Sequence, residues 1–151
     1  MIRELKALTV AATMFASSAY AFDPDDLQKL RDTNKCVKCD LSRANLSDAN
    51  LKDADLSRAN LSGARLWRAN LMDADLSRAN LRSASLWDAD LRDADLTNTE
   101  LFDADLIDTD LTNTDLSGAN LRDAIFTRAV MKGAILCNTT VSDGSVIYSG
   151  C

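Results

Sequence analysis

Large apolar residues recur at every fifth position of this chain. From Leu41 to Leu121 a leucine stands at each fifth residue, 17 times in succession, and the same phase continues in Phe126, Met131, Leu136 and Val141. Two places before each large residue stands a small one, which between residues 44 and 139 is alanine 16 times and threonine four times. A period of five fits neither an amphipathic helix nor an alternating strand. The pattern therefore indicates a repeat architecture.

The polarity within each five-residue unit predicts how the chain is wound. If the alanine and the leucine both point inward, the other three positions point outward, which explains why those three are polar. An inward pair in every unit requires a bend in every unit, and regular bends close the chain into coils that stack as a solenoid. Stacked coils bond backbone to backbone at a spacing of about 4.8 Å, and each coil contacts only its neighbours.

The repeating unit resembles the consensus of the pentapeptide-repeat family, Ala-(Asp/Asn)-Leu-x-x. The match covers residues 39–141 with about 21 consecutive units. The resemblance implies an all-β fold, a right-handed quadrilateral β-helix with four units in each coil. Residues twenty positions apart then lie above one another, so the sequence becomes a map of the outer surface.

Composition changes at both ends predict the domain limits. Residues 1–21 read as a secretory signal peptide, with a basic start, a short apolar stretch and the small-x-small site Ala19-Tyr20-Ala21. Residues 22–35 form an N-terminal capping helix, because Asp23 precedes Pro24 and two acidic residues, and because Leu27 and Leu30 share one helix face. The β-helix then occupies residues 36–141. The aperiodic residues 142–151, with a turn at Asp143-Gly144, form a C-terminal cap.

Export to an oxidising compartment follows from the signal peptide and from four cysteines in so small a chain. We expect the periplasm, the thylakoid lumen if the source is cyanobacterial, or secretion, with no membrane association after cleavage. Without residues 1–21 the chain has 15 basic and 22 acidic residues. Residues 22–80 are balanced, at 10 acidic and 10 basic, whereas residues 81–151 have 12 acidic and 5 basic.

The four cysteines lie in two pairs at opposite ends of the implied rod. Cys36 and Cys39 belong to the first coil, and Cys137 and Cys151 bracket the C-terminal tail. A shared zinc site is excluded because the pairs would be roughly 25 Å apart at the coil spacing, and zinc–thiolate bonds are about 2.3 Å long. We expect two disulfides, Cys36–Cys39 and Cys137–Cys151, with a redox-active Cys-x-x-Cys as the alternative. The opening Cys-Val-Lys-Cys-Asp-Leu and the ending around Cys137 and Cys151 resemble those of exported or lumenal pentapeptide-repeat proteins of cyanobacteria and plastids.

Aspartates form one stripe on the surface map. Its members stand twenty residues apart in two neighbouring columns: Asp55, Asp75, Asp95 and Asp115 in one, and Asp53, Asp73 and Asp93 in the other. Oxygen-rich sites suit Ca²⁺, so a cation-binding edge is one interpretation. The other interpretation is a solvated polar face, because Asp before Leu is what the consensus requires.

Apolar residues form a second column. Trp67 and Trp87 stand twenty residues apart at an outward position, and Ile107 continues the column. Exposed apolar patches often mark partner sites, although aromatic stacking between coils would also explain the column.

The function predicted from these features is that of a non-catalytic, exported rod that presents surfaces to an unidentified protein partner. Catalysis is not expected, because the chain has no histidine and no nucleophile–base or phosphate-cradling motif. No cofactor is expected, and the short basic column Lys38, Arg58 and Arg78 is not a nucleic-acid site. Two alternatives remain: Ca²⁺ binding along the aspartate stripe, and mimicry of duplex DNA, as in family members that inhibit DNA gyrase.

Overall fold

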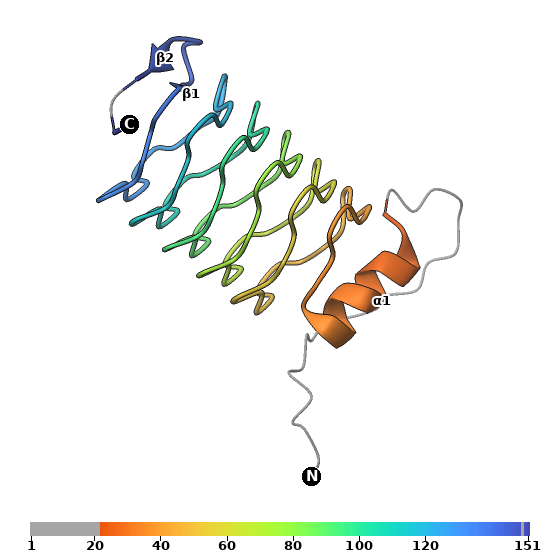
Figure 1. The fold of residues 1–151 in the computed structure, drawn as a ribbon. Coiled ribbons are helices and arrows are strands. Elements are labelled where there is room, and N and C mark those ends of the chain that lie inside the picture. The colour runs from red at the N-terminus through yellow and green to blue at the C-terminus, as the bar shows by residue number, and fades with distance from the viewer. Residues whose placement is uncertain (1–21, 149) are drawn as a thin grey trace.

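The computed structural model describes residues 22–148 and 150–151 as a short helix followed by a rod of stacked coils (Figure 1). The helix α1 spans Pro24–Thr33, and the strands β1 and β2 span Thr139–Thr140 and Val146–Ile147. The predicted signal peptide, residues 1–21, lies outside the described residues. No helix within the described part of the chain is long and apolar enough to cross a membrane.

Coils of twenty residues build the rod. Parallel β-bridges join each residue before a leucine to the residue twenty positions later, as in the series Asn50, Asn70, Asp90 and Asp110. Beside these bridges, the Leu71 amide donates to the Asp90 carbonyl oxygen at 2.8 Å, and the Asn70 amide donates to that of Ala49 at 2.9 Å. Four five-residue units therefore complete one coil, which confirms the predicted period.

Each unit turns at a residue in the left-handed backbone region. The Ala74 amide donates to the Leu71 carbonyl oxygen at 3.1 Å, and Asp73 between them has a φ of 57°. The 21 such residues at five-residue intervals from Lys38 to Asn138 include 8 Asp, 3 Asn and 3 Gly. These three residue types tolerate positive φ best. Many of the outward aspartates are therefore explained by the backbone alone, which the sequence analysis did not foresee.

Leucine and alanine fill the axis of the rod as expected. All the leucines from Leu41 to Leu121 are buried, and so are the alanines that precede them. Where threonine replaces alanine, its hydroxyl is also buried and donates to the carbonyl oxygen of the leucine 23 residues earlier. Thr109, for example, bonds to Leu86 at 2.8 Å. The substitution thus adds a hydrogen bond between coils inside the core.

The N-terminal end of the rod is closed by α1. The side chain of Asp23 accepts from the Asp25 amide at 2.9 Å, so the helix begins with the expected cap and with Pro24 in its first turn. Leu27 and Leu30 are buried against the core. This arrangement matches the predicted capping helix and removes the first coil's leucines from solvent.

The C-terminal end is only partly covered. The antiparallel strands β1 and β2 enclose the turn at Asp143-Gly144, and β1 begins inside the last predicted repeat unit. Ile125, Val130 and Ile135 occupy the position that Asp or Asn fills in most units, and they are 53%, 47% and 39% exposed. The last coil therefore presents an apolar rim rather than a polar one.

Candidate partner-binding surface

Trp67, Trp87 and Ile107 form one outward column on successive coils, as the surface map predicts. The coils are joined beside them: the Arg68 amide donates to the Trp87 carbonyl oxygen at 2.9 Å, and the Asp88 amide donates to that of Ile107 at 3.0 Å. Trp67 and Trp87 are 38% and 39% exposed, and Ile107 is half-buried. We call these three residues the tryptophan column.

Ion pairs border the tryptophan column at both ends. Arg68 bonds to Asp48 at 2.8 Å and lies 5.8 Å from the centre of the Trp67 ring. One coil beyond Trp87, Asp108 accepts two hydrogen bonds of 2.6 Å from Arg128, which lies on the following coil. The indole N–H of Trp87 donates to the same carboxylate at 3.3 Å. The two indole rings are thus held by charged neighbours, which limits the side-chain freedom lost on binding a partner.

The carboxylate of Asp108 is the charged group most closely tied to the column. The hydrogen bond from Arg128 lowers the pKa of Asp108, and the charge of Arg128 and the indole N–H of Trp87 act in the same direction. The pKa of Arg128 is raised by the same hydrogen bond. Asp108 is therefore ionised throughout the neutral range and keeps Arg128 beside the column.

The aspartate stripe is present, but its carboxylates have structural partners. In the column Asp55, Asp75, Asp95 and Asp115, each side chain accepts from the amide two residues later, at 3.3, 2.9, 2.8 and 2.9 Å respectively. The other column, Asp53, Asp73 and Asp93, supplies left-handed turn residues. Among the described residues, no three carboxylates of the stripe bring their oxygens within 4.8 Å of one another. The stripe is a set of aspartates with structural tasks rather than a chelating cluster.

Both cysteine pairs form disulfides. Cys36 and Cys39 are joined at the first coil and are fully buried. Cys137 and Cys151 are joined at the other end, where they attach the tail to the last coil. The pairing matches the one expected from the sequence. The only group of three potential metal ligands in the described part of the chain is Asp26 with Cys36 and Cys39, and its two sulfurs are already consumed by the disulfide.

The family model for pentapeptide repeats matches residues 39–78, 74–107 and 104–143, with 8 copies in all. The chain belongs to the pentapeptide repeat family. Membership implies the right-handed β-helix expected above, and members of the family are typically non-enzymatic structural or interaction proteins. The comparison with curated proteins finds no match.

Solved structures of other pentapeptide repeat proteins resemble this one. A protein from the thylakoid lumen of Arabidopsis thaliana is 29% identical over 66% of this chain and 69% of its own, with a TM-score of 0.63. Rfr23 from the cyanobacterium Cyanothece 51142 is 29% identical over 73% of this chain and 92% of its own, with a TM-score of 0.41. HetL from Nostoc, involved in heterocyst differentiation regulation, is 36% identical over 75% of this chain and 62% of its own, with a TM-score of 0.35.

The charged border of the tryptophan column was missed in the sequence analysis, although the signal was present. Asp48 and Arg68 stand twenty residues apart, as do Asp108 and Arg128. In a pentapeptide repeat protein this spacing places opposite charges on adjacent coils. Pairing each charge with its neighbour twenty residues away would have identified both ion pairs.

Proposed function

We propose that this pentapeptide repeat protein is an exported, non-catalytic interaction module whose tryptophan column binds a protein partner. The carrying observation is the exposure of Trp67 and Trp87 on adjacent coils, in a column where a polar residue would satisfy the fold equally well. Tryptophan and arginine are the residues that most often dominate binding energy at protein interfaces, and both are present here.

The surroundings of the column support a role in binding. Arg68 and Arg128 are each held by a carboxylate, so they frame the apolar surface with fixed charges. An apolar centre within a polar border is the usual anatomy of a protein interface.

Export is supported by two observations. All four cysteines are in disulfides, which persist in oxidising compartments. One structural relative is a thylakoid lumen protein. We expect the protein purified from its host to begin near Phe22, and mass spectrometry of fractionated cells tests this. An uncleaved protein in the cytosolic fraction would contradict export.

The two alternative functions lack comparable support among the described residues. The aspartate stripe offers no cluster of three carboxylates for Ca²⁺. Mimicry of DNA requires a continuous acidic surface, whereas the first three coils carry exposed basic residues such as Arg43, Arg58 and Arg82.

The partner site can be tested with the two tryptophans themselves, because the chain contains only these two. Proteins cross-linked to the wild type in its own compartment are compared with those cross-linked to the Trp67→Ala/Trp87→Ala double variant. Met72→Ala, at the equivalent position of another side, is the matched control. We expect a specific cross-linked protein with wild type and control that is lost with the double variant. The cross-linked partner, once purified, should also shield the indole rings of Trp67 and Trp87 from acrylamide quenching of their fluorescence. Equal cross-linking of all three proteins would refute the proposal.

A further inference from the structure

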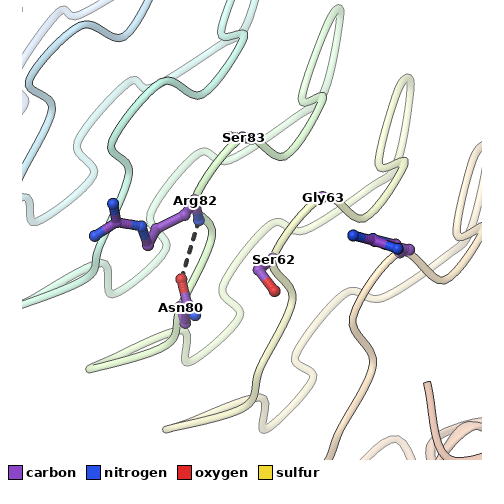
Figure 2. Close-up of a pocket in the computed structure, with 6 residues that line it drawn as sticks. Ser62, Gly63, Asn80, Arg82 and Ser83 are labelled. Carbon is purple, nitrogen blue, oxygen red and sulfur yellow. Dashed lines mark hydrogen bonds between the residues drawn. The ribbon is translucent and has the colours of Figure 1, made fainter. Parts of the chain in front are cut away.

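A notch opens on another side of the rod, at Gly63. Gly63 is a left-handed turn residue with a φ of 65°, and the same column carries Arg43 one coil before and Ser83 one coil after. Because Gly63 has no side chain, a hollow of about 380 Å³ remains, lined also by Ser62, Asn80 and Arg82 (Figure 2). An added Cβ at Gly63 would come within 3.3 Å of Arg43 Cγ, so even a small side chain would begin to fill it.

The polar groups on the floor of the notch already have partners. The Ser62 hydroxyl donates to Asn60 Oδ1 at 2.8 Å, and the Asn80 amide group donates to the same oxygen at 3.3 Å. The Ser83 hydroxyl donates to Asp103 at 2.9 Å. The donors that remain for a ligand are therefore the second N–H of the Asn80 amide group and the guanidinium groups of Arg43 and Arg82.

Neither of these two arginines has an acidic partner among the described residues. Within the described residues, ion pairs involve Lys52, Arg68, Arg92, Arg122 and Arg128, but not Arg43 or Arg82. Arg82 instead lies over the ring of Phe102, at 4.7 Å from its centre. Exposed Arg65, two residues after Gly63, also has no ion pair within the described part of the chain. The guanidinium groups at the notch are therefore not neutralised by carboxylates and remain open to an anionic ligand.

We propose that the Gly63 notch binds a phosphate or phosphoryl group between Arg43 and Arg82. The two arginines come from coils two apart, so their backbones are roughly 10 Å apart at the usual strand spacing. Two guanidinium groups neutralise a doubly charged anion, and their fork of donors matches its oxygens. Figure 2 shows Arg82 reaching away from Ser62, so binding requires this side chain to turn back. Exposed side chains change rotamer within nanoseconds.

The probe is inorganic phosphate, titrated into the purified protein while its backbone amides are followed by NMR. We expect saturable shifts at Ser62, Gly63 and Ser83. Arg43→Ala and Arg82→Ala should each weaken binding by about tenfold or more, because each removes charge-assisted hydrogen bonds. Arg58→Ala is the control, since Arg58 is exposed and has no ion pair with any described residue, but does not line the notch.

A second variant tests whether the ligand needs the empty space at Gly63, rather than the charges of the two arginines. Gly63→Asn keeps both arginines and suits the left-handed turn, which asparagine occupies in other coils, for example at Asn98. It should abolish the saturable shifts while leaving the spectrum of distant coils unchanged. Unsaturable shifts in the wild type, or equal weakening by Arg58→Ala, would overturn the proposal.

The source of the phosphoryl group is distinguished by a parallel titration with a phosphoserine peptide. Tighter binding of the peptide than of free phosphate would identify a modified protein as the ligand. Binding of free phosphate alone would identify a small-ion site. Both outcomes support the notch, and both are independent of the tryptophan column.

Discussion

Glycine substitutions at two neighbouring residues should change the free energy of unfolding in opposite directions, because only one of the two residues occupies a left-handed corner of the rod. Arg78 has a φ of 59° and is exposed, and its amide donates to the Thr97 carbonyl oxygen at 2.8 Å, a bond that glycine would keep. A residue with a Cβ pays roughly 1–2 kcal/mol for this conformation. Glycine removes that cost but loses about 0.5–1 kcal/mol through its freer unfolded chain. Arg78→Gly should therefore stabilise the protein by about 0.5–1 kcal/mol.

The residue just before it provides the matched comparison. Ser77 is absent from the residues with positive φ, and its amide bonds to Asp75 at 2.9 Å whatever its side chain. Glycine at this position relieves nothing, so Ser77→Gly should cost about 0.5–1 kcal/mol. Arg78→Asn should also stabilise, because asparagine tolerates the left-handed region.

The assay for this pair is urea unfolding at 25 °C, followed by circular dichroism. We expect the midpoint to rise for Arg78→Gly and to fall for Ser77→Gly, with the slope unchanged in both. If both glycines moved the midpoint downward, the corners would not be under the strain that their φ angles imply. If Arg78→Asn behaved like the wild type while Arg78→Gly gained, the gain would come from elsewhere than the backbone conformation.

Four further outcomes follow from individual contacts. Thr109→Ala should lower the unfolding free energy by about 1–2 kcal/mol in the same urea assay, because it removes a buried hydrogen bond and a methyl group. The folded-state pKa of Asp108 is depressed, so its stabilisation is present above the unfolded pKa of about 3.9 and is lost as pH falls through the folded value. In Arg128→Ala, carboxyl-carbon NMR should show the Asp108 pKa rising. Reducing Cys137–Cys151 should cost roughly 3 kcal/mol for a loop of this length, and alkylation should label Cys151 before the buried N-terminal pair. Added Ca²⁺ should leave the thermal midpoint unchanged, since no three carboxylates of the stripe converge.

The period of five was sufficient to predict the coils, because burial dictates it. A leucine can be buried at every fifth residue only if the chain bends once in each unit, and the bridges at twenty-residue spacing confirm four bends per coil. The capping helix was predictable for the same kind of reason, since Asp23 and Pro24 are local start signals. The position of Trp67 one coil before Trp87 in the same column followed from arithmetic once the coil length was assumed.

The left-handed backbone conformation at each corner could not be predicted from the twenty-residue spacing. Asp53 and Asp55 look alike in the sequence, yet Asp53 occupies a left-handed turn and Asp55 accepts a hydrogen bond from the amide of Ser57. Composition at the corner position carried the signal, because Asp, Asn and Gly dominate there. The Gly63 notch was hidden for a different reason: its depth depends on which side chains surround the glycine in the coils before and after.

In a solenoid this regular, residues that satisfy the repeat say little about function, because each already has a structural task. Aspartates turn the chain or accept its amides, and leucines fill the axis. The positions that indicate function are those where the repeat tolerates many residue types but holds one that the fold itself does not require. Trp67 and Trp87 expose apolar surface where a polar side chain would suffice. This exposure costs solubility in the isolated protein and becomes favourable once a partner covers the rings. The Gly63 notch is informative because glycine leaves a hollow where most other corners carry a side chain. The two surfaces lie on different sides of the rod, so a rigid scaffold can hold both ligands at once.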